Sequence, residues 1–176
     1  MKLVHLARRF FASLVARPLS REEDAWVRAL LLPGEFELWA RQARYDRRHT
    51  LGVARRVERA LGPESEPIWL AAALLHDVGK LQAHLGIPGR VAATLTMAVI
   101  GYERVVSWAG VPGVRGRFGC YAAHGEIGAE LVRASGGRDQ VAVWAATHHR
   151  IKAKDPGTGF GLPQAVVFAL RDSDRD

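Results

Sequence analysis

Apolar residues recur at intervals of three and four along most of the chain, and this spacing predicts helices almost throughout. In residues 1–16 they fill one face of a helix, and Lys2, Arg8 and Arg9 lie on the opposite face. A basic amphipathic helix can lie on a membrane surface or pack against the rest of its own protein. We favour packing, and we expect Pro18 to end the helix.

The next segments carry signals that begin and end helices. Ser20 and Glu23 form a capping-box pattern, and the helix that they begin is expected to run to Pro33-Gly34. A longer helix is predicted over 44–61, where a Gly-Pro pair stops it. Residues 67–77 are apolar almost all round, which is typical of a buried central helix.

The rest of the chain follows the same pattern, without the alternation of a β-strand. Further helices are expected over 88–109, 124–134, 140–149 and 163–176. A Gly- and Lys-rich loop over 151–162 separates the last two. The prediction is an all-α protein, with one domain over 44–176 and an N-terminal helical extension over 1–43.

Composition narrows the class of protein. With 176 residues, 48% of them apolar, the chain is long enough for one domain with its own hydrophobic core. The single cysteine, Cys120, cannot form an internal disulfide or a cysteine-based zinc site. The longest apolar run, 91–100, is too short to span a bilayer, and the N-terminus lacks the pattern of a secretory signal. We therefore expect a cytoplasmic protein without a membrane span.

The net charge of +7 allows two interpretations. A basic surface attracts anions such as nucleotides and nucleic acid. Alternatively the arginines, 21 of the 25 cations, solvate the outer faces of helices. One group of them lies close together in sequence: Arg44, Arg47, Arg48, Arg55, Arg56 and Arg59. No nucleic-acid-binding motif accompanies the charge, so nucleic acid is the less favoured partner.

A His-Asp pair, His76-Asp77, closes the apolar helix over 67–77. Burying a carboxylate or an unpaired imidazole costs several kcal/mol, on the order of 2–7, unless another group binds it. A metal ion would bind both side chains. The ordinary alternative is a helix end with normal hydrogen bonds, and this pair by itself does not decide between the two.

Other potential ligands occur at the ends or on the inward faces of predicted helices. They are His49, His124, His148 and His149, with Asp172 and Asp174 near the C-terminus. Each histidine alone is explained well by a cap or a favourable interaction with the helix dipole. The complete ordered set indicates a metal site instead.

Three segments carry a resemblance to a known family. They are HDVGK over 76–80, HGEIGAELV over 124–132, with Gly125 where proline is usual, and THH over 147–149. In this order they resemble the HD superfamily of metal-dependent phosphohydrolases, in the branch that includes the HD-GYP cyclic-dinucleotide phosphodiesterases. The resemblance covers residues 44–176 and implies the helical bundle of an HD domain.

The resemblance also implies a binuclear site. One metal would be held by His49, His76, Asp77 and Asp174, and the other by Asp77, His124, His148 and His149. Asp77 would bridge the two, Lys80 would direct its ammonium at a substrate phosphate, and Asp172 is the alternative to Asp174. Five imidazoles and two carboxylates suit two divalent transition metals, namely iron, manganese, cobalt or nickel.

The implied reaction is hydrolysis of a phosphoester by water that the two metals activate. The expected partner is a small phosphorylated substrate such as a nucleotide. The cyclic-di-GMP branch has Glu after the paired histidines and a short GYP element. Here Arg150 follows them, and the segment over 155–163 is longer and only faintly similar. The resemblance therefore does not imply specificity for cyclic di-GMP, and the oligomeric state stays open.

The sequence leaves two alternatives to a phosphohydrolase. Some HD-fold proteins, such as myo-inositol oxygenase, activate dioxygen at a di-iron site, but they typically have one histidine where this chain has His148 and His149. A metal-binding regulatory module without turnover is the other, and the complete ligand set with Lys80 argues against it.

Overall fold

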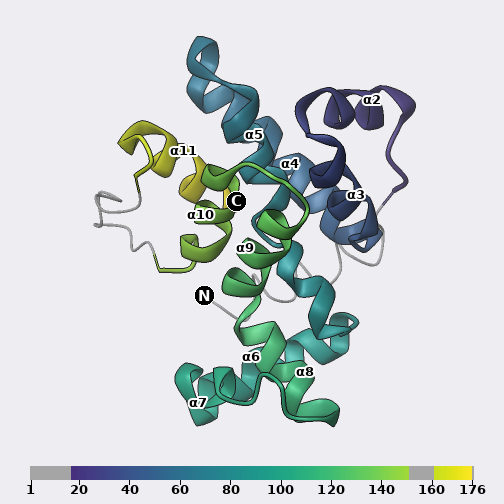
Figure 1. Cartoon of the computed structure of the whole chain (residues 1–176), viewed down its shortest axis with the longest axis vertical. Coiled ribbons are helices and arrows are strands. Elements are labelled where there is room, and N and C mark those ends of the chain that lie inside the picture. The colour runs from purple at the N-terminus through teal and green to yellow at the C-terminus, as the bar shows by residue number, and fades with distance from the viewer. Residues whose placement is uncertain (1–16, 151–160, 176) are drawn as a thin grey trace.

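The computed structural model describes residues 17–150 and 161–175. Every regular element in these two ranges is helical and none is a strand (Figure 1), so the all-α prediction is confirmed. The predicted helix over 1–16 and nearly all of the predicted loop over 151–162 lie outside the described residues.

The elements follow one another in a simple order. They are α2 (Arg21–Leu30), α3 (Pro33–Arg41), α4 (Arg44–Leu61), the 3-10 turn η1 (Gly62–Glu64), α5 (Pro67–Leu75), the 3-10 turn η2 (Val78–Ala83), α6 (Ile87–Ile100), α7 (Tyr102–Val106), α8 (Gly113–Ala122), α9 (His124–Ala134), α10 (Asp139–Thr147) and α11 (Gln164–Arg175).

Helix α2 begins at the predicted capping box but ends earlier than predicted. The Ser20 hydroxyl accepts the Glu23 N–H, and the Glu23 carboxylate accepts the Ser20 N–H at 2.8 Å. Pro33 does not end this helix; it begins α3, where a missing N–H costs nothing. The Glu35 carboxylate then accepts the Leu32 N–H at 3.0 Å. The expected helix therefore ends at Leu30, before Pro33-Gly34, and α3 is a further helix that was not predicted.

Helix α5 lies at the centre of the core. Every residue from Trp69 to Leu75 is buried, as expected for a helix that is apolar all round. It packs against α2, α3, α4, α10 and α11. Trp39 and Trp144 are buried with it, and burying a large apolar side chain stabilises the folded state by about 1.5–3 kcal/mol.

The predicted helix over 88–109 is wrong as a single element. Gly101, with φ of 98°, separates α6 from α7, because a left-handed residue ends the helical hydrogen-bond ladder. Helix α8 was not predicted at all, since its glycines are poor helix formers. A Cβ on Gly116 would lie 1.6 Å from the Val111 carbonyl oxygen, so the absence of a side chain lets α8 pack against the preceding turn.

Helices α6, α7 and α8 form the lower end of the molecule in Figure 1, below the other helices. Arg90 joins this part to α4, because its guanidinium donates to both carboxylate oxygens of Asp46, at 2.7 and 2.9 Å. Most of the exposed large apolar side chains belong to the lower end: Leu95, Val99, Ile100, Tyr102, Val111 and Val114.

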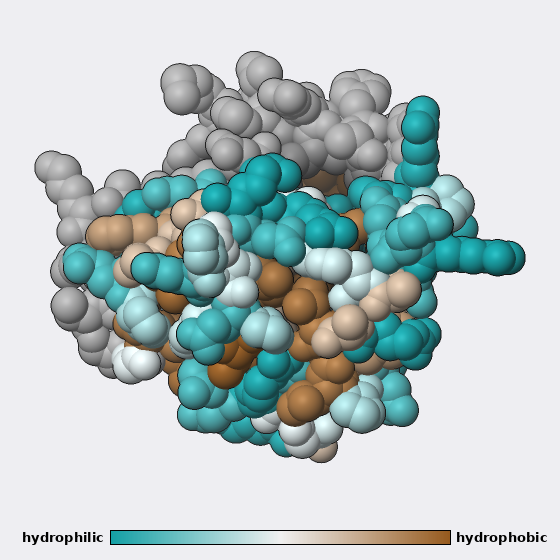
Figure 2. Space-filling model, turned by 90° about the horizontal axis from the view of Figure 1, so that it is seen from above, coloured by the Kyte–Doolittle hydropathy of each residue, from teal (hydrophilic) through white to brown (hydrophobic). Residues whose placement is uncertain are grey.

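On the face drawn in Figure 2, hydrophilic side chains surround smaller apolar patches, as on most protein surfaces.

Two arginines from the group that lies close together in sequence, Arg48 and Arg55, form contacts within the protein. Arg48 donates to Glu23 at 2.6 Å and to the carbonyl oxygen of Pro18, also at 2.6 Å. Arg55 lies 3.5 Å from the centroid of the Trp26 ring. These arginines therefore do more than solvate the outer face of a helix, because they join residues 17–30 to α4.

Among the described residues, no single helix combines the length and apolar character needed to cross a membrane. One bent pair, 67–83 with 87–100, meets that test by length and composition only, and its two parts meet at 90°.

Candidate metal centre

The fold brings all seven predicted ligands together from five helices and the junctions that follow them. His49 lies in α4, His76 and Asp77 follow α5, His124 begins α9, His148 and His149 follow α10, and Asp174 lies in the last turn of α11. His76, Asp77, His124 and His148 are buried. Side chains separated by up to 125 residues in sequence therefore meet at one place.

The chain bends after α5 in a way that directs the His-Asp pair towards α9. His76 keeps helical backbone angles, Asp77 leaves them, and η2 begins at Val78. A Cβ on Gly79 would lie 1.9 Å from the His124 carbonyl oxygen, so only glycine lets η2 lie against the start of α9. As a result Asp77 Oδ1 lies 3.3 Å from His124 Nε2.

The side chains form two groups that share Asp77. The first group contains Asp77, His124, His148 and His149, and each residue offers a ligand atom within 4.8 Å of the others. In it, the Nε2 atoms of His124 and His149 face each other at 2.5 Å. His148 Nε2 lies 3.8 Å from Asp77 Oδ1.

The second group contains His49, His76 and Asp77, again with ligand atoms within 4.8 Å of one another. Asp174 adjoins it, since its Oδ1 lies 3.1 Å from His49 Nε2 and 3.3 Å from His76 Nε2. His76 Nε2 also lies 3.6 Å from Asp77 Oδ2. These are the two sets of four side chains that the resemblance implies.

Three of the imidazoles are oriented by the same backbone contact. His76 Nδ1 donates to the Ala73 carbonyl at 2.8 Å, His124 Nδ1 to that of Tyr121 at 2.6 Å, and His148 Nδ1 to that of Ala145 at 2.8 Å. A carbonyl only accepts, so the proton of the neutral ring is assigned to Nδ1 and the lone pair to Nε2. This is the arrangement found in most histidines that bind metal ions.

Two of these lone pairs have no hydrogen-bond partner. His76 Nε2 and His148 Nε2 are buried, and neither forms a hydrogen bond within the described part of the chain. A buried polar atom without a partner costs about 1–3 kcal/mol. Both atoms face the carboxylates of the centre, so a cation placed there would remove this cost.

Electrostatics keeps the carboxylates of the centre ionised. Burial would raise the pKa of Asp77, but Lys80, His76 and His124 outweigh it, and the pKa lies well below its ordinary value. The pKa of Asp174 is also lowered, because His76 and His49 outweigh its burial. Two anionic carboxylates, the buried Asp77 and the partly exposed Asp174, therefore stand among imidazoles, a donor set that favours divalent cations.

Burial and nearby charges shift the pKa of three of the histidines, His76, His148 and His149. Burial lowers the pKa of His148 well below its ordinary value, and the neighbouring rings of His149, His76 and His124 add to this. The pKa of His149 falls to about 3, because burial and then the neighbouring His124 ring disfavour its charged form. These two rings are neutral at pH 7, as ligands must be. In His76 the charges of Asp77 and Asp174 outweigh burial and raise the pKa to about 9, so this ring carries a second proton at pH 7 that a bound metal would displace.

Lys80 lies beside Asp77. Its ammonium donates to Asp77 Oδ2, three residues earlier in the chain. Burial opposes the charge, but Asp77 outweighs it and raises the pKa of Lys80. The lysine thus brings a positive charge into the centre.

The two C-terminal aspartates have different positions. Asp174 lies against His49 and His76. Asp172 is largely exposed and forms an ion pair with Arg171 at 2.7 Å. The choice of Asp174 as the ligand stays a prediction.

Sequence reasoning missed the backbone acceptors and one arginine. Each acceptor lies three residues before its histidine, a fixed spacing that a histidine at a helix end can reach. Arg56 of α4 donates to the carbonyl oxygen of Ser173, directly before Asp174. The only sequence signal for it was its position seven residues after His49, on the same face of the helix.

Comparison with known proteins gives one family. The HD domain family matches residues 47–167, a range that contains six of the seven predicted ligands and ends before Asp174. No curated protein and no solved structure matches the chain significantly. The predicted division into 1–43 and 44–176 stays a prediction.

Proposed function

Because the chain belongs to the HD domain family, we propose that it is a metal-dependent phosphohydrolase with two divalent transition metals in one centre. The observation that carries this proposal is the shared carboxylate: Asp77 belongs to both groups of potential ligands. A carboxylate between two sets of imidazoles is how a protein holds two cations close enough to act on one phosphate.

We assign the ligands by these groups. His49, His76, Asp77 and Asp174 would hold one metal, and Asp77, His124, His148 and His149 the other. The unpartnered Nε2 atoms of His76 and His148 support the assignment, since one falls in each set. Iron, manganese, cobalt and nickel all suit imidazole and carboxylate ligands.

The metals would supply an activated water and stabilise negative charge on the phosphoryl oxygens. The protein's own residues would have two further roles. The carbonyls of Ala73, Tyr121 and Ala145 hold the rings in the orientation needed for binding. The Lys80 ammonium, held at Asp77, would interact with a phosphate of the substrate.

The substrate that we propose is a nucleotide or a similar small phosphoester. A net charge of +7 attracts phosphorylated molecules to the protein and supports this class.

The test measures metal content and turnover in the same preparations. Protein purified without chelator is analysed for metals and assayed with bis(p-nitrophenyl) phosphate, as the wild type and as Asp77→Ala. We expect close to two transition-metal ions per chain in the wild type and at least a hundredfold loss of hydrolysis in the variant, because both ligand sets lose a member.

Asp139→Ala is the matched control. Asp139 is an exposed aspartate that pairs with Arg133, so removing it leaves the centre intact. It should keep the metal content and activity of the wild type. Wild-type protein without bound metal, or full hydrolysis in Asp77→Ala, would refute the proposed function.

A further inference from the structure

Helix α11 brings Asp174 to the centre in its last turn, where a helix is weakest. The last four carbonyl groups of a helix have no N–H partner inside the helix, so this turn frays unless other groups bind them. In the described part of the chain α11 runs to Arg175, and the Ser173 carbonyl lies in its last described turn. Asp174 depends on the order of this turn to face His49 and His76.

Arg56 binds that carbonyl. Its Nε donates to the Ser173 oxygen at 2.9 Å, and Ser173 itself is buried. A cation near a helix C-terminus also interacts favourably with the helix dipole. The guanidinium therefore holds the last turn of α11 by a hydrogen bond and by its charge.

Helix α4 contacts two neighbouring residues of α11, Ser173 and Asp174. His49 and Arg56 lie seven residues apart, which is two helical turns, so their side chains leave the same face of α4. His49 contacts Asp174, and Arg56 contacts Ser173. Because α4 and α11 pack along each other, the helix that supplies one potential ligand also fixes the position of another.

Arg59 provides a comparison within the structure. It comes one turn after Arg56, and both line an open groove of about 790 Å³ between α4 and α11. No hydrogen bond or ion pair joins Arg59 to α11 among the described residues. The two arginines thus share helix, charge and groove but differ in the contact with Ser173.

We propose that Arg56 is a positioning residue that holds Asp174 in place as a metal ligand. This inference rests on the metal centre of the proposed function and adds a residue that the ligand sets do not contain. Arg56 acts on one side only, since Asp174 belongs to the set of His49 and His76. Among the described residues, the set of Asp77, His124, His148 and His149 contains neither Asp174 nor a contact with Arg56.

The test is a titration of metal-free protein with cobalt(II), followed by the visible absorption of the bound ion. The variants are Arg56→Met, Asp174→Ala and the double variant, with Arg59→Met as the matched control. In the wild type we expect two binding steps. Arg56→Met should weaken one step about 10- to 100-fold, as is usual when the partner of a ligand is removed, and leave the other unchanged.

The double variant separates a positioning role from a general effect on stability. If Arg56 acts through Asp174, adding Arg56→Met to Asp174→Ala changes neither cobalt step further. Arg56→Lys, which keeps a donor and a charge, should regain part of the lost affinity. Arg56→Gln serves the same comparison if the methionine variant does not fold, as judged by circular dichroism.

The outcomes distinguish this inference from the proposed function. Two normal steps in Arg56→Met, while Asp174→Ala loses one, would overturn the role of Arg56 and leave the metal centre standing. Equal weakening of both steps, or of one step in Arg59→Met, would also overturn it. A wild-type chain that binds no cobalt would refute the metal centre itself, and the role of Arg56 with it.

Discussion

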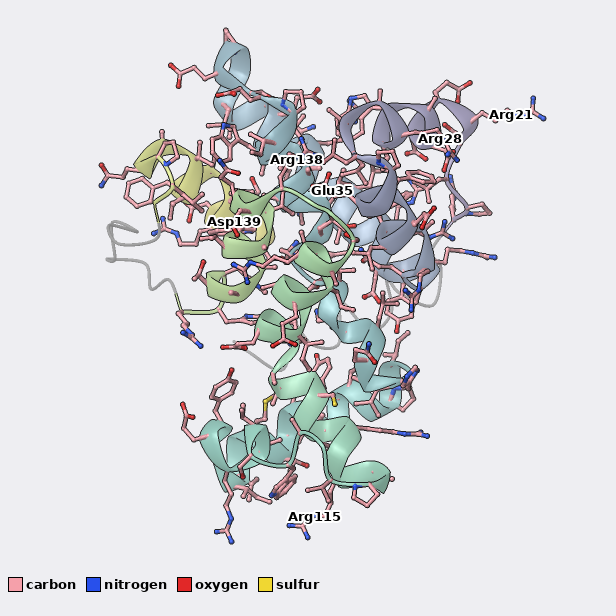
Figure 3. The ribbon with its side chains drawn as sticks, in the orientation of Figure 1. Arg21, Arg28, Glu35, Arg115, Arg138 and Asp139 are labelled. Carbon is pink, nitrogen blue, oxygen red and sulfur yellow. The ribbon has the colours of Figure 1, made fainter. Side chains whose placement is uncertain are left out.

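At the scale of single residues, the buried pair of Glu35 and Arg138 shows how one carboxylate can hold several elements together. The Glu35 carboxylate accepts the Leu32 N–H, the Arg138 N–H and two guanidinium N–H groups, at 2.5 to 3.0 Å. Figure 3 shows the two side chains directed at each other, one from α3 and one from the segment before α10. Burial would raise the pKa of Glu35, but Arg138 and the backbone donors outweigh it and lower the pKa.

We predict that Glu35→Gln lowers the free energy of unfolding at pH 7 by about 2–4 kcal/mol, because it leaves the Arg138 charge without its partner. The folded pKa of Glu35 is below its ordinary value of 4.5, so the ionised form stabilises the fold fully above that pH. That contribution decreases as the pH falls through the folded pKa. Urea unfolding at pH 7, 5 and 3.5 should therefore show the two proteins becoming more alike in acid.

Glu58→Gln is the control for this prediction. Glu58 pairs with Arg55 on the surface of α4, where an ion pair contributes about 0–1 kcal/mol. It should change the free energy of unfolding little at any pH. A Glu35→Gln protein as stable as Glu58→Gln at pH 7 would contradict a stabilising role for the buried pair.

At the scale of elements, glycines decide how closely two segments approach. Gly79 lies where η2 meets α9, and a Cβ there would lie 2.6 Å from the Gly128 backbone nitrogen as well as against the His124 carbonyl. Gly52 lies in the middle of α4, and its Cβ would meet only the end of the Arg56 side chain, at 3.4 Å. The same substitution therefore has opposite consequences at the two positions.

We predict that Gly79→Ala lowers the free energy of unfolding by about 3 kcal/mol or more, because backbone must move to admit the methyl group. It should also weaken metal binding, since Asp77 and His124 are held by the same contact. Gly52→Ala should raise stability by about 0.5–1 kcal/mol, because alanine loses less conformational entropy in a helix. Chemical unfolding of both variants measures the difference, and a neutral Gly79→Ala would show that η2 and α9 can separate without cost.

At the scale of the whole molecule, the candidate metal centre depends on several helices packing together. Its side chains come from α4, α9 and α11 and from the junctions after α5 and α10, elements that are far apart in sequence. In the unfolded chain these side chains do not form a site. Metal binding would therefore stabilise the folded state by mass action.

We predict that manganese or cobalt at about 100 times its dissociation constant adds about 2.7 kcal/mol of stability. For a chain of this length this corresponds to a rise of about 5–10 °C in Tm. Excess chelator should reverse the rise, and Asp77→Ala should abolish most of it. An equal rise with magnesium, which prefers oxygen ligands, would argue against a centre made mainly of imidazoles.

The sequence by itself determined the features that depend on neighbouring residues. The capping box at Ser20, helix α4 and the start of α9 were predicted correctly, because caps, helix breakers and periodic apolar residues act within a few positions. The order of histidines and aspartates also predicted which side chains to look for. Local signals failed where a proline began a helix instead of ending one, at Pro33, and where glycines packed closely within a helix, in α8.

Only the tertiary structure decided how these side chains meet. His49 and Asp174 are 125 residues apart, and no local pattern specifies their distance of 3.1 Å. The contact of Arg56 with Ser173, 117 residues later in the chain, also depends on how helices pack. The physical reason is that a sequence pattern encodes which face of a helix is buried, whereas the position of an atom in the centre depends on several helices packing at once.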